Sequence, residues 1–101
     1  MAQWFKVAKK SDIPAGSGLL VDVNGQEVAL FNVGGKVQAM YAVCPHQGGP
    51  LHEGGLDGKI VTCPWHGWEF DVTNGVCTFN DSITNPVFKV KEEGEDILVE
   101  G

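Results

Sequence analysis

The sequence predicts an all-β protein, an antiparallel β-sandwich or small barrel. Three observations lead to this fold class. Short runs rich in β-branched and aromatic residues recur along the chain of 101 residues, glycine-containing turn pairs separate many of them, and helical periodicity is almost absent. A chain of this length builds one hydrophobic core, and we find no linker or internal repeat, so we expect a single domain over residues 1–101.

The expected strands follow one another closely, because each is a short run of residues that favour extended backbone. In chain order they are QWFKVA (3–8), GLLVDV (18–23), EVALFNV (27–33), KVQAMYAV (36–43), KIVTC (59–63), WEFDV (68–72), VCTF (76–79), PVFKVK (86–91) and DILVE (96–100).

The turns between these runs are explicit in the sequence. Asn24-Gly25, Asp57-Gly58 and Asn74-Gly75 are pairs that favour a type I′ hairpin turn, since both central residues of that turn need positive φ. Gly34-Gly35 can form the same turn. Only SDIPAG (11–16) suggests a helical turn.

The charge of the chain narrows the possible partners. Seven lysines and no arginine stand against 13 acidic residues, which gives a net charge of -6. This balance argues against nucleic acid or an anionic membrane surface and favours a basic protein partner. No segment approaches the roughly 18 consecutive apolar residues of a membrane span, and the N-terminus lacks the apolar core of a signal peptide. We therefore expect a cytosolic protein.

Two short motifs carry the chemistry. Cys44 and His46 flank Pro45, and sixteen residues separate His46 from Cys63, which pairs with His66 in CPWH. Each motif follows an expected strand, so two turns can project side by side from the sheet and meet at one site. A disulfide framework is not expected, because the chain has three cysteines and a bridge would use at least one of the two in the motifs.

Two thiolates and two imidazoles suit either zinc or iron. A structural zinc site needs four such ligands in a tetrahedral arrangement. However, zinc modules usually space paired ligands by two or more residues, and the single residue between Cys44 and His46 is tight for chelating one ion. If the cysteines bind one metal atom and the histidines another, the spacing is no obstacle. A dinuclear cluster is thus favoured, and a zinc-stabilised structural module stays open.

The motifs CPH and CPWHG, set in an all-β chain of this length, resemble those of the Rieske-type 2Fe-2S ferredoxins. The resemblance implies one 2Fe-2S cluster per chain, held by a cluster-binding subdomain that two loops form at about residues 43–70. Cys44 and Cys63 would hold the inner iron, and His46 and His66 the outer iron near the surface.

In function, the resemblance implies a soluble, monomeric electron carrier that passes single electrons from a flavin reductase to a terminal iron-dependent oxygenase. The chain would not be the oxygenase, since only His52 remains after the cluster ligands and cannot make a site of two histidines and a carboxylate. An alternative is a small subunit of a larger reductase, of the nitrite reductase type.

The sequence departs from the membrane-bound respiratory branch of that family. Gly49 and Trp65 stand where those proteins carry a disulfide, and Trp68 and Phe70 stand where they carry serine and tyrosine donors to the cluster sulfurs. Fewer donors leave the reduced cluster less stabilised. We therefore expect the low-potential branch, near the lower end of the Rieske range at about -150 mV.

The remaining candidates carry weaker signals. The two tryptophans either wall the cluster against water or fill the core. His52 is expected to be a plain loop residue, and Cys77 a buried structural thiol. Residues 47–51 form either a docking rim or a simple loop closure. Pro86 is similar to a proline in a third loop over the cluster, or it merely starts the next strand. Residues 91–96 (KEEGED) are expected to be a solvated hairpin tip.

Overall fold

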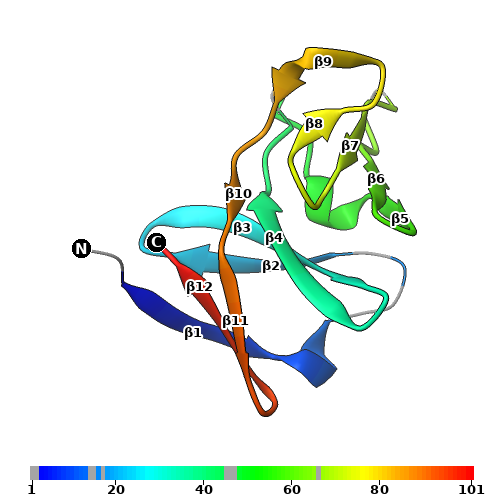
Figure 1. Cartoon of the computed structure of the whole chain (residues 1–101). Coiled ribbons are helices and arrows are strands. Elements are labelled where there is room, and N and C mark those ends of the chain that lie inside the picture. The colour runs from blue at the N-terminus through cyan, green and yellow to red at the C-terminus, as the bar shows by residue number, and fades with distance from the viewer. Residues whose placement is uncertain (1–2, 14–15, 17, 45–47, 66) are drawn as a thin grey trace.

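The computed structural model describes residues 3–13, 16, 18–44, 48–65 and 67–101. Figure 1 shows three sheets stacked one upon another, with the first and last strands of the chain, β1 and β12, both in the lowest sheet. Every strand pairing among the described residues is antiparallel, which confirms the all-β sandwich. No helix in the described part of the chain is long and apolar enough to cross a membrane.

The strands form three sheets with the orders β1-β12-β11, β10-β4-β3-β2 and β5-β6-β7-β8-β9. Their bounds are β1 Trp4–Lys9, β2 Gly18–Val23, β3 Gln26–Val33, β4 Lys36–Tyr41, β5 Gly55–Asp57, β6 Ile60–Thr62, β7 Glu69–Asp71, β8 Val76–Cys77, β9 Asn80–Thr84, β10 Val87–Phe88, β11 Val90–Glu93 and β12 Asp96–Glu100. Two 3-10 turns complete the elements, η1 at Lys10–Asp12 and η2 at Leu51–Glu53.

The middle sheet is buried on both faces, and β3 shows why. Its run Val28, Ala29, Leu30 and Phe31 is fully buried, whereas a strand with one wet face would alternate with polar residues. Val28 and Leu30 belong to the core shared with the three-stranded sheet. Ala29 and Phe31 belong to the core beneath the five-stranded sheet. The successive side chains of one strand therefore hold the outer two layers together.

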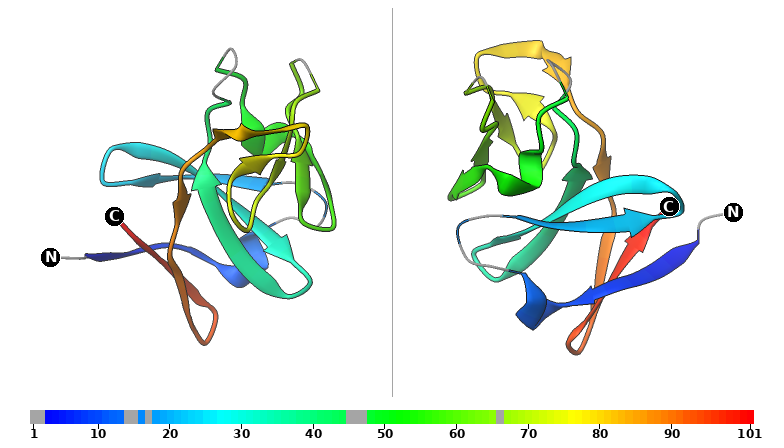
Figure 2. Two further views of the ribbon diagram at one scale, coloured as in Figure 1. Left: turned by 45° about the horizontal axis from the view of Figure 1, so that its top comes forward. Right: turned by 180° about the vertical axis from the view of Figure 1, so that it is seen from behind.

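The five-stranded sheet forms a subdomain at one end of the molecule (Figure 2), and it extends to Thr84, beyond the expected residues 43–70. Its core also contains the thiols of all three cysteines, together with Phe70 and Val72. Both loops that carry the cysteine motifs border this core, one entering from β4 and the other lying between β6 and β7. The subdomain thus places the two motifs on a common hydrophobic base.

Most of the expected strands are present, and the differences have physical causes. The sequence did not reveal β5 and β9, because GLD and NDSIT are short, polar and exposed or half-exposed. The run 86–91 was wrong as one strand. It contributes β10, which pairs with β4, and β11, which pairs with β12, so the chain changes sheets at Lys89.

Two of the four turn predictions are confirmed. Asn24-Gly25 and Gly34-Gly35 have positive φ at both central residues, as type I′ requires. The other two are wrong as type I′ turns, since Asp57 and Asn74 do not have positive φ. At Asp57-Gly58 the central residues are Gly58 and Lys59, because Asp57 pairs with Ile60. At Asn74-Gly75 the turn is longer, and the Gly75 N–H donates to Asp71 O at 2.7 Å.

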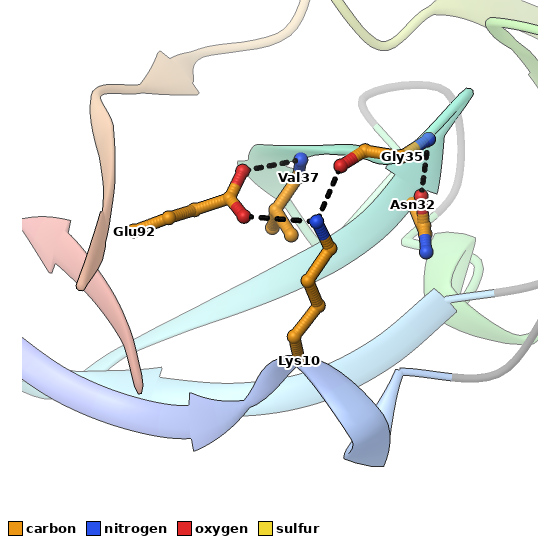
Figure 3. Close-up of polar contacts among 5 residues, drawn as sticks. All are labelled: Lys10, Asn32, Gly35, Val37 and Glu92. Carbon is orange, nitrogen blue, oxygen red and sulfur yellow. Dashed lines mark hydrogen bonds and ion pairs between the residues drawn. The ribbon is translucent and has the colours of Figure 1, made fainter. Parts of the chain in front are cut away.

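The acidic hairpin at residues 91–96 is present, with an exposed tip at Gly94 and Glu95, but it is not wholly solvated. Glu92 reaches back to the sheet edge, where Oε2 accepts from the Val37 N–H at 3.3 Å and Oε1 lies 3.1 Å from Lys10 Nζ. Lys10 also donates to Gly35 O at 2.6 Å (Figure 3). The hydrogen bond from Val37 is the largest cause that lowers the pKa of Glu92, and the contacts with Lys10 lower it further.

The helical turn expected within 11–16 is displaced in the structure. The 3-10 turn covers Lys10–Asp12, and the Lys9 N–H donates to the Asp12 carboxylate at 3.1 Å. Pro14 and Ala15 lie outside the described residues. A second short turn, η2, was not expected and begins at Leu51, in the loop that the first cysteine motif opens.

Candidate metal centre

The two motif loops share one backbone pattern. In the first loop, the Cys44 N–H donates to Gly49 O at 2.9 Å and the Gly48 N–H donates to Cys44 O at 2.8 Å. In the second, the Cys63 N–H donates to Trp68 O at 2.7 Å and the Gly67 N–H donates to Cys63 O at 3.0 Å. Each cysteine is thus bonded to the residues four and five positions later.

Glycine is required at the same place in each loop. Gly48 and Gly67 both have φ of +75°, a left-handed conformation that costs a residue with a Cβ more than it costs glycine. The two loops are therefore similar turns built around a cysteine, and each fixes the backbone next to its thiol.

The loops lie against each other at the cysteines. A Cβ added to Gly49 would lie 2.7 Å from Cys63 Sγ, so the first loop closes directly over the thiol of the second. Cys44 and Cys63 are each only 2% exposed. All three cysteines lie among the described residues, and they are thiols rather than disulfides. The structure thereby places Cys44 and Cys63, two of the four predicted ligands, in one core on adjoining loops.

The predicted ligands His46 and His66, together with Gln47 of the predicted rim, lie outside the described residues. Two buried thiols on adjoining loops fit the cysteine half of a two-iron cluster, because soft thiolates suit iron and each loop leads on to a histidine position. The residues present are thus compatible with the cofactor that the motifs imply.

The tryptophans have different surroundings. Trp65 is 57% exposed, and its Cγ lies 3.2 Å from where a Cβ of Gly49 would be. Positions 49 and 65, which match the disulfide of the respiratory branch, are therefore neighbours here, filled by a glycine and an indole ring. Trp68 packs against the core, with ring contacts to Phe70 at 6.5 Å and Phe79 at 5.3 Å. Core filling accounts for Trp68.

A third chain segment runs beside the first loop. It is the crossing between β9 and β10, where Pro86 O accepts from the Tyr41 N–H at 2.8 Å. Tyr41 is the last residue of β4 and lies three positions before Cys44. Pro86 thus directly precedes a strand and also borders the entry to the first cysteine loop. Sequence reasoning missed its neighbour Asn85, which is buried at 4% exposure.

His52 packs its backbone against β2, and Cys77 lies buried in the core. His52 lies in η2, where its backbone packs on β2 so closely that a Cβ at Gly18 would lie 3.0 Å from His52 Cα. Cys77 is 2% exposed within the core of the five-stranded sheet, so the prediction of a buried thiol is confirmed.

Comparison with known proteins identifies the family. The model of the Rieske [2Fe-2S] domain matches residues 3–91. The chain belongs to the Rieske [2Fe-2S] domain family. Its cofactor is therefore a 2Fe-2S cluster, and the zinc module considered from the sequence is set aside. The family match covers the middle and five-stranded sheets and both cysteine loops.

Two relatives of the chain are ferredoxin components of dioxygenase systems. The ferredoxin component of naphthalene 1,2-dioxygenase/salicylate 5-hydroxylase systems from Ralstonia sp is 39% identical over 77 residues, which are 74% of each chain. The ferredoxin component of a naphthalene 1,2-dioxygenase system from Pseudomonas aeruginosa is 31% identical over 99 residues, covering 97% of this chain and 95% of the relative.

Solved structures share the fold. A chain in the complex of reduced oxygenase and oxidized ferredoxin in carbazole 1,9a-dioxygenase is 32% identical, with a TM-score of 0.86, covering 97% of this chain and 93% of that one. A putative NADH-dependent nitrite reductase small subunit from Mycobacterium tuberculosis has a TM-score of 0.91 at 24% identity, covering 100% and 96%. The second likeness shows the fold alone.

Proposed function

We propose that Cys44, His46, Cys63 and His66 hold one 2Fe-2S cluster per chain, with the cysteines on the inner iron and the histidines on the outer one. The observation that carries this proposal is the contact between the two matching loops, which brings Gly49 against Cys63 Sγ. When bound, the cluster supplies reversible one-electron transfer. The two buried thiols fit an inner position, since each is 2% exposed.

In this proposal the chain is the ferredoxin of a ring-hydroxylating dioxygenase system and carries single electrons from a flavin reductase to a terminal oxygenase. Both relatives described above are ferredoxin components, and the first solved structure is a ferredoxin–oxygenase complex. The protein acts as a monomer in the cytosol and as a single Rieske domain over residues 1–101. It is an electron carrier and not itself the catalyst.

The partner surface is the end of the five-stranded sheet where the two loops lie. Trp65 is an exposed aromatic residue there, since it is 57% exposed and lies against Gly49, which in turn faces the buried thiol of Cys63. Gly49 borders Trp65, and the exposed Gly48 and half-buried Pro50 flank Gly49 in the first loop. Exposed aromatic residues commonly anchor protein interfaces. The nitrite reductase alternative has only the shared fold in its favour.

The test of the ligand set uses Cys77 as a matched control, because it is buried to the same 2% as the two motif cysteines but lies in β8. We expect Cys44→Ser, His46→Ala, Cys63→Ser and His66→Ala each to abolish or severely reduce the bound iron and acid-labile sulfide. Cys77→Ser should keep a full cluster. The proposal is refuted if the wild-type protein, purified anaerobically, contains zinc without sulfide, or if the ligand variants keep their iron.

A further inference from the structure

Asn85 is the buried polar side chain whose role the proposed function does not include. Among the described residues it is the one polar residue in the buried class, at 4% exposure. It lies between the end of β9 at Thr84 and the start of β10 at Val87. A buried amide is costly unless its hydrogen bonds are made. Its partners therefore indicate what the residue is for.

Both the side chain and the backbone of Asn85 have partners from distant segments. Nδ2 donates to Tyr41 O at 2.8 Å, and the backbone N–H donates to Gly75 O at 2.7 Å. The packing at Gly75 is tight, since a Cβ there would lie against Asn85 O. Three segments thus meet at Asn85: the end of β4, the turn between β7 and β8, and the crossing from β9 to β10.

The Asn85 side chain replaces a hydrogen bond that Pro86 cannot make. Val87 pairs with Met40 in the β10–β4 ladder, so position 86 lies opposite Tyr41. In a hydrogen-bonded antiparallel pair the two residues exchange both N–H to O bonds. Tyr41 donates to Pro86 O, but proline has no N–H to return. The Asn85 amide supplies the missing donor to Tyr41 O.

This arrangement bears on the cluster because Tyr41 leads into the first cysteine loop, three residues before Cys44. The crossing from β9 to β10 and the segment that rises from β4 run beside each other between the middle and five-stranded sheets (Figure 1). If the side-chain bond is lost, the Tyr41 to Pro86 bond and the neighbouring Val87–Met40 pair remain to hold these two segments together. The more weakly held crossing can then separate from the loop entry and admit water.

We propose that Asn85 is a positioning residue that keeps the β9–β10 crossing closed against the Cys44 loop and thereby holds down the reduction potential of the cluster. The inference rests on the proposed ligand set. Reduction adds one negative charge, and water that reaches the site stabilises that charge, so solvent exposure is one of the factors that set the potential of a cluster. Opening the crossing should therefore raise the potential.

The first experiment compares Asn85→Ala with Val99→Ala by protein-film voltammetry and by thermal melting. Val99 is fully buried in the core on the other face of the middle sheet, so its truncation destabilises the protein away from the loops. We expect both variants to melt earlier and to retain the cluster spectrum, but only Asn85→Ala to shift the potential, and upward. An unchanged or lowered potential in Asn85→Ala, or an equal upward shift in Val99→Ala, overturns the proposal.

The second experiment restores the backbone N–H that Pro86 lacks. Pro86→Ala restores a backbone N–H opposite Tyr41 O, so the Asn85 side chain becomes partly redundant in that background. Removing Asn85 should then shift the potential by less than half as much as it does in the wild type, a coupling that a double-mutant cycle measures. Additive shifts overturn the proposal. If Asn85→Ala does not fold, Asn85→Ser takes its place in the same cycle.

These outcomes separate the two proposals. A wild-type protein without iron and sulfide refutes the ligand set before any Asn85 variant is made. A wild-type protein with an intact cluster, whose potential does not respond to Asn85, refutes the positioning role and leaves the ligand set standing.

Discussion

At the scale of single residues, Gly49 shows how closely the two loops approach. It does not need positive φ, so its backbone conformation alone does not require glycine. The restriction comes from its neighbours, since an added Cβ would lie 2.7 Å from Cys63 Sγ and 3.2 Å from the Trp65 ring. In the proposed centre, Cys63 is committed to iron and cannot move away. Glycine here is a requirement of the site.

We therefore predict that Gly49→Ala weakens cluster binding. Overpacking of this kind typically costs about 1–3 kcal/mol, and here the strain falls on a ligand atom. Iron and sulfide content per chain, measured after purification at equal expression, should fall clearly below the wild-type value. Gly55→Ala is the matched control, because nothing lies within 4 Å of a Cβ at Gly55 and its φ is not positive. Equal cluster content in the two variants would contradict the prediction.

The sequence predicts some single-residue features and misses others for a physical reason. The motif cysteines and Gly25 and Gly34-Gly35 in the hairpin turns are local patterns that need no knowledge of the fold. Asn85 is different, because its partner Tyr41 lies 44 positions away in the chain. Only the proline after it is a sign in the sequence, since Pro86 lacks the N–H that the ladder needs.

At the scale of elements, boundaries follow burial. The bounds of β2 and β12 match the expected runs 18–23 and 96–100. β2 pairs with β3 at every residue, and buried and half-buried residues alternate along β12. β9 was missed because its five residues are exposed or half-exposed and no apolar pattern marks them. The chain changes sheets at Lys89 because β10 pairs with β4 and β11 pairs with β12. Local sequence does not encode that choice.

The contacts of Glu92 with Lys10 and Val37 add polar links between the β11–β12 hairpin and the rest of the sandwich, beside the core packing of Ile97 and Val99 (Figure 3). We predict that Glu92→Ala lowers the free energy of unfolding by about 1 kcal/mol, since a partly exposed ion pair and a charge-assisted hydrogen bond are lost together. In a domain of this size, that is a fall of about 4–8 °C in Tm. Glu93→Ala is the control, because the Glu93–Lys91 pair is exposed on both sides.

The same contacts predict a pH dependence. The pKa of Glu92 is lowered from 4.5 in the folded protein, so its contribution is fully present above about that pH and is lost as the pH falls through the lower folded value. The stability difference between Glu92→Ala and Glu93→Ala should be constant near neutral pH and shrink in acid. Denaturation curves at a series of pH values measure it. A difference that grows in acid would contradict the assignment.

At the scale of the whole molecule, the net negative charge is distributed unevenly among the three stacked sheets. The three-stranded sheet lies at one end, and the five-stranded sheet, which carries the cysteine loops, lies at the other (Figures 1 and 2). Residues 48–86, which include the loop-bearing sheet, contain five acidic residues and one lysine, so this segment carries most of the net charge of -6. The proposed electron port is therefore the more acidic end, and it should attract a basic partner surface.

The charge distribution predicts how the reaction with a partner depends on salt and on position. Reduction by a flavin reductase that serves the wild-type protein should slow as salt is added, because the Debye length falls from about 30 Å at 0.01 M to about 8 Å at 0.15 M. Glu53→Lys, in η2 beside the first loop, should slow the reaction at low salt much more than Glu95→Lys, at the tip of the distant β11–β12 hairpin. Both changes alter the net charge equally, so only position differs. Stopped-flow traces at several salt concentrations, with the cluster spectrum as a check of integrity, measure the effect. Equal rates for the two variants at every salt concentration would place the port elsewhere on the molecule.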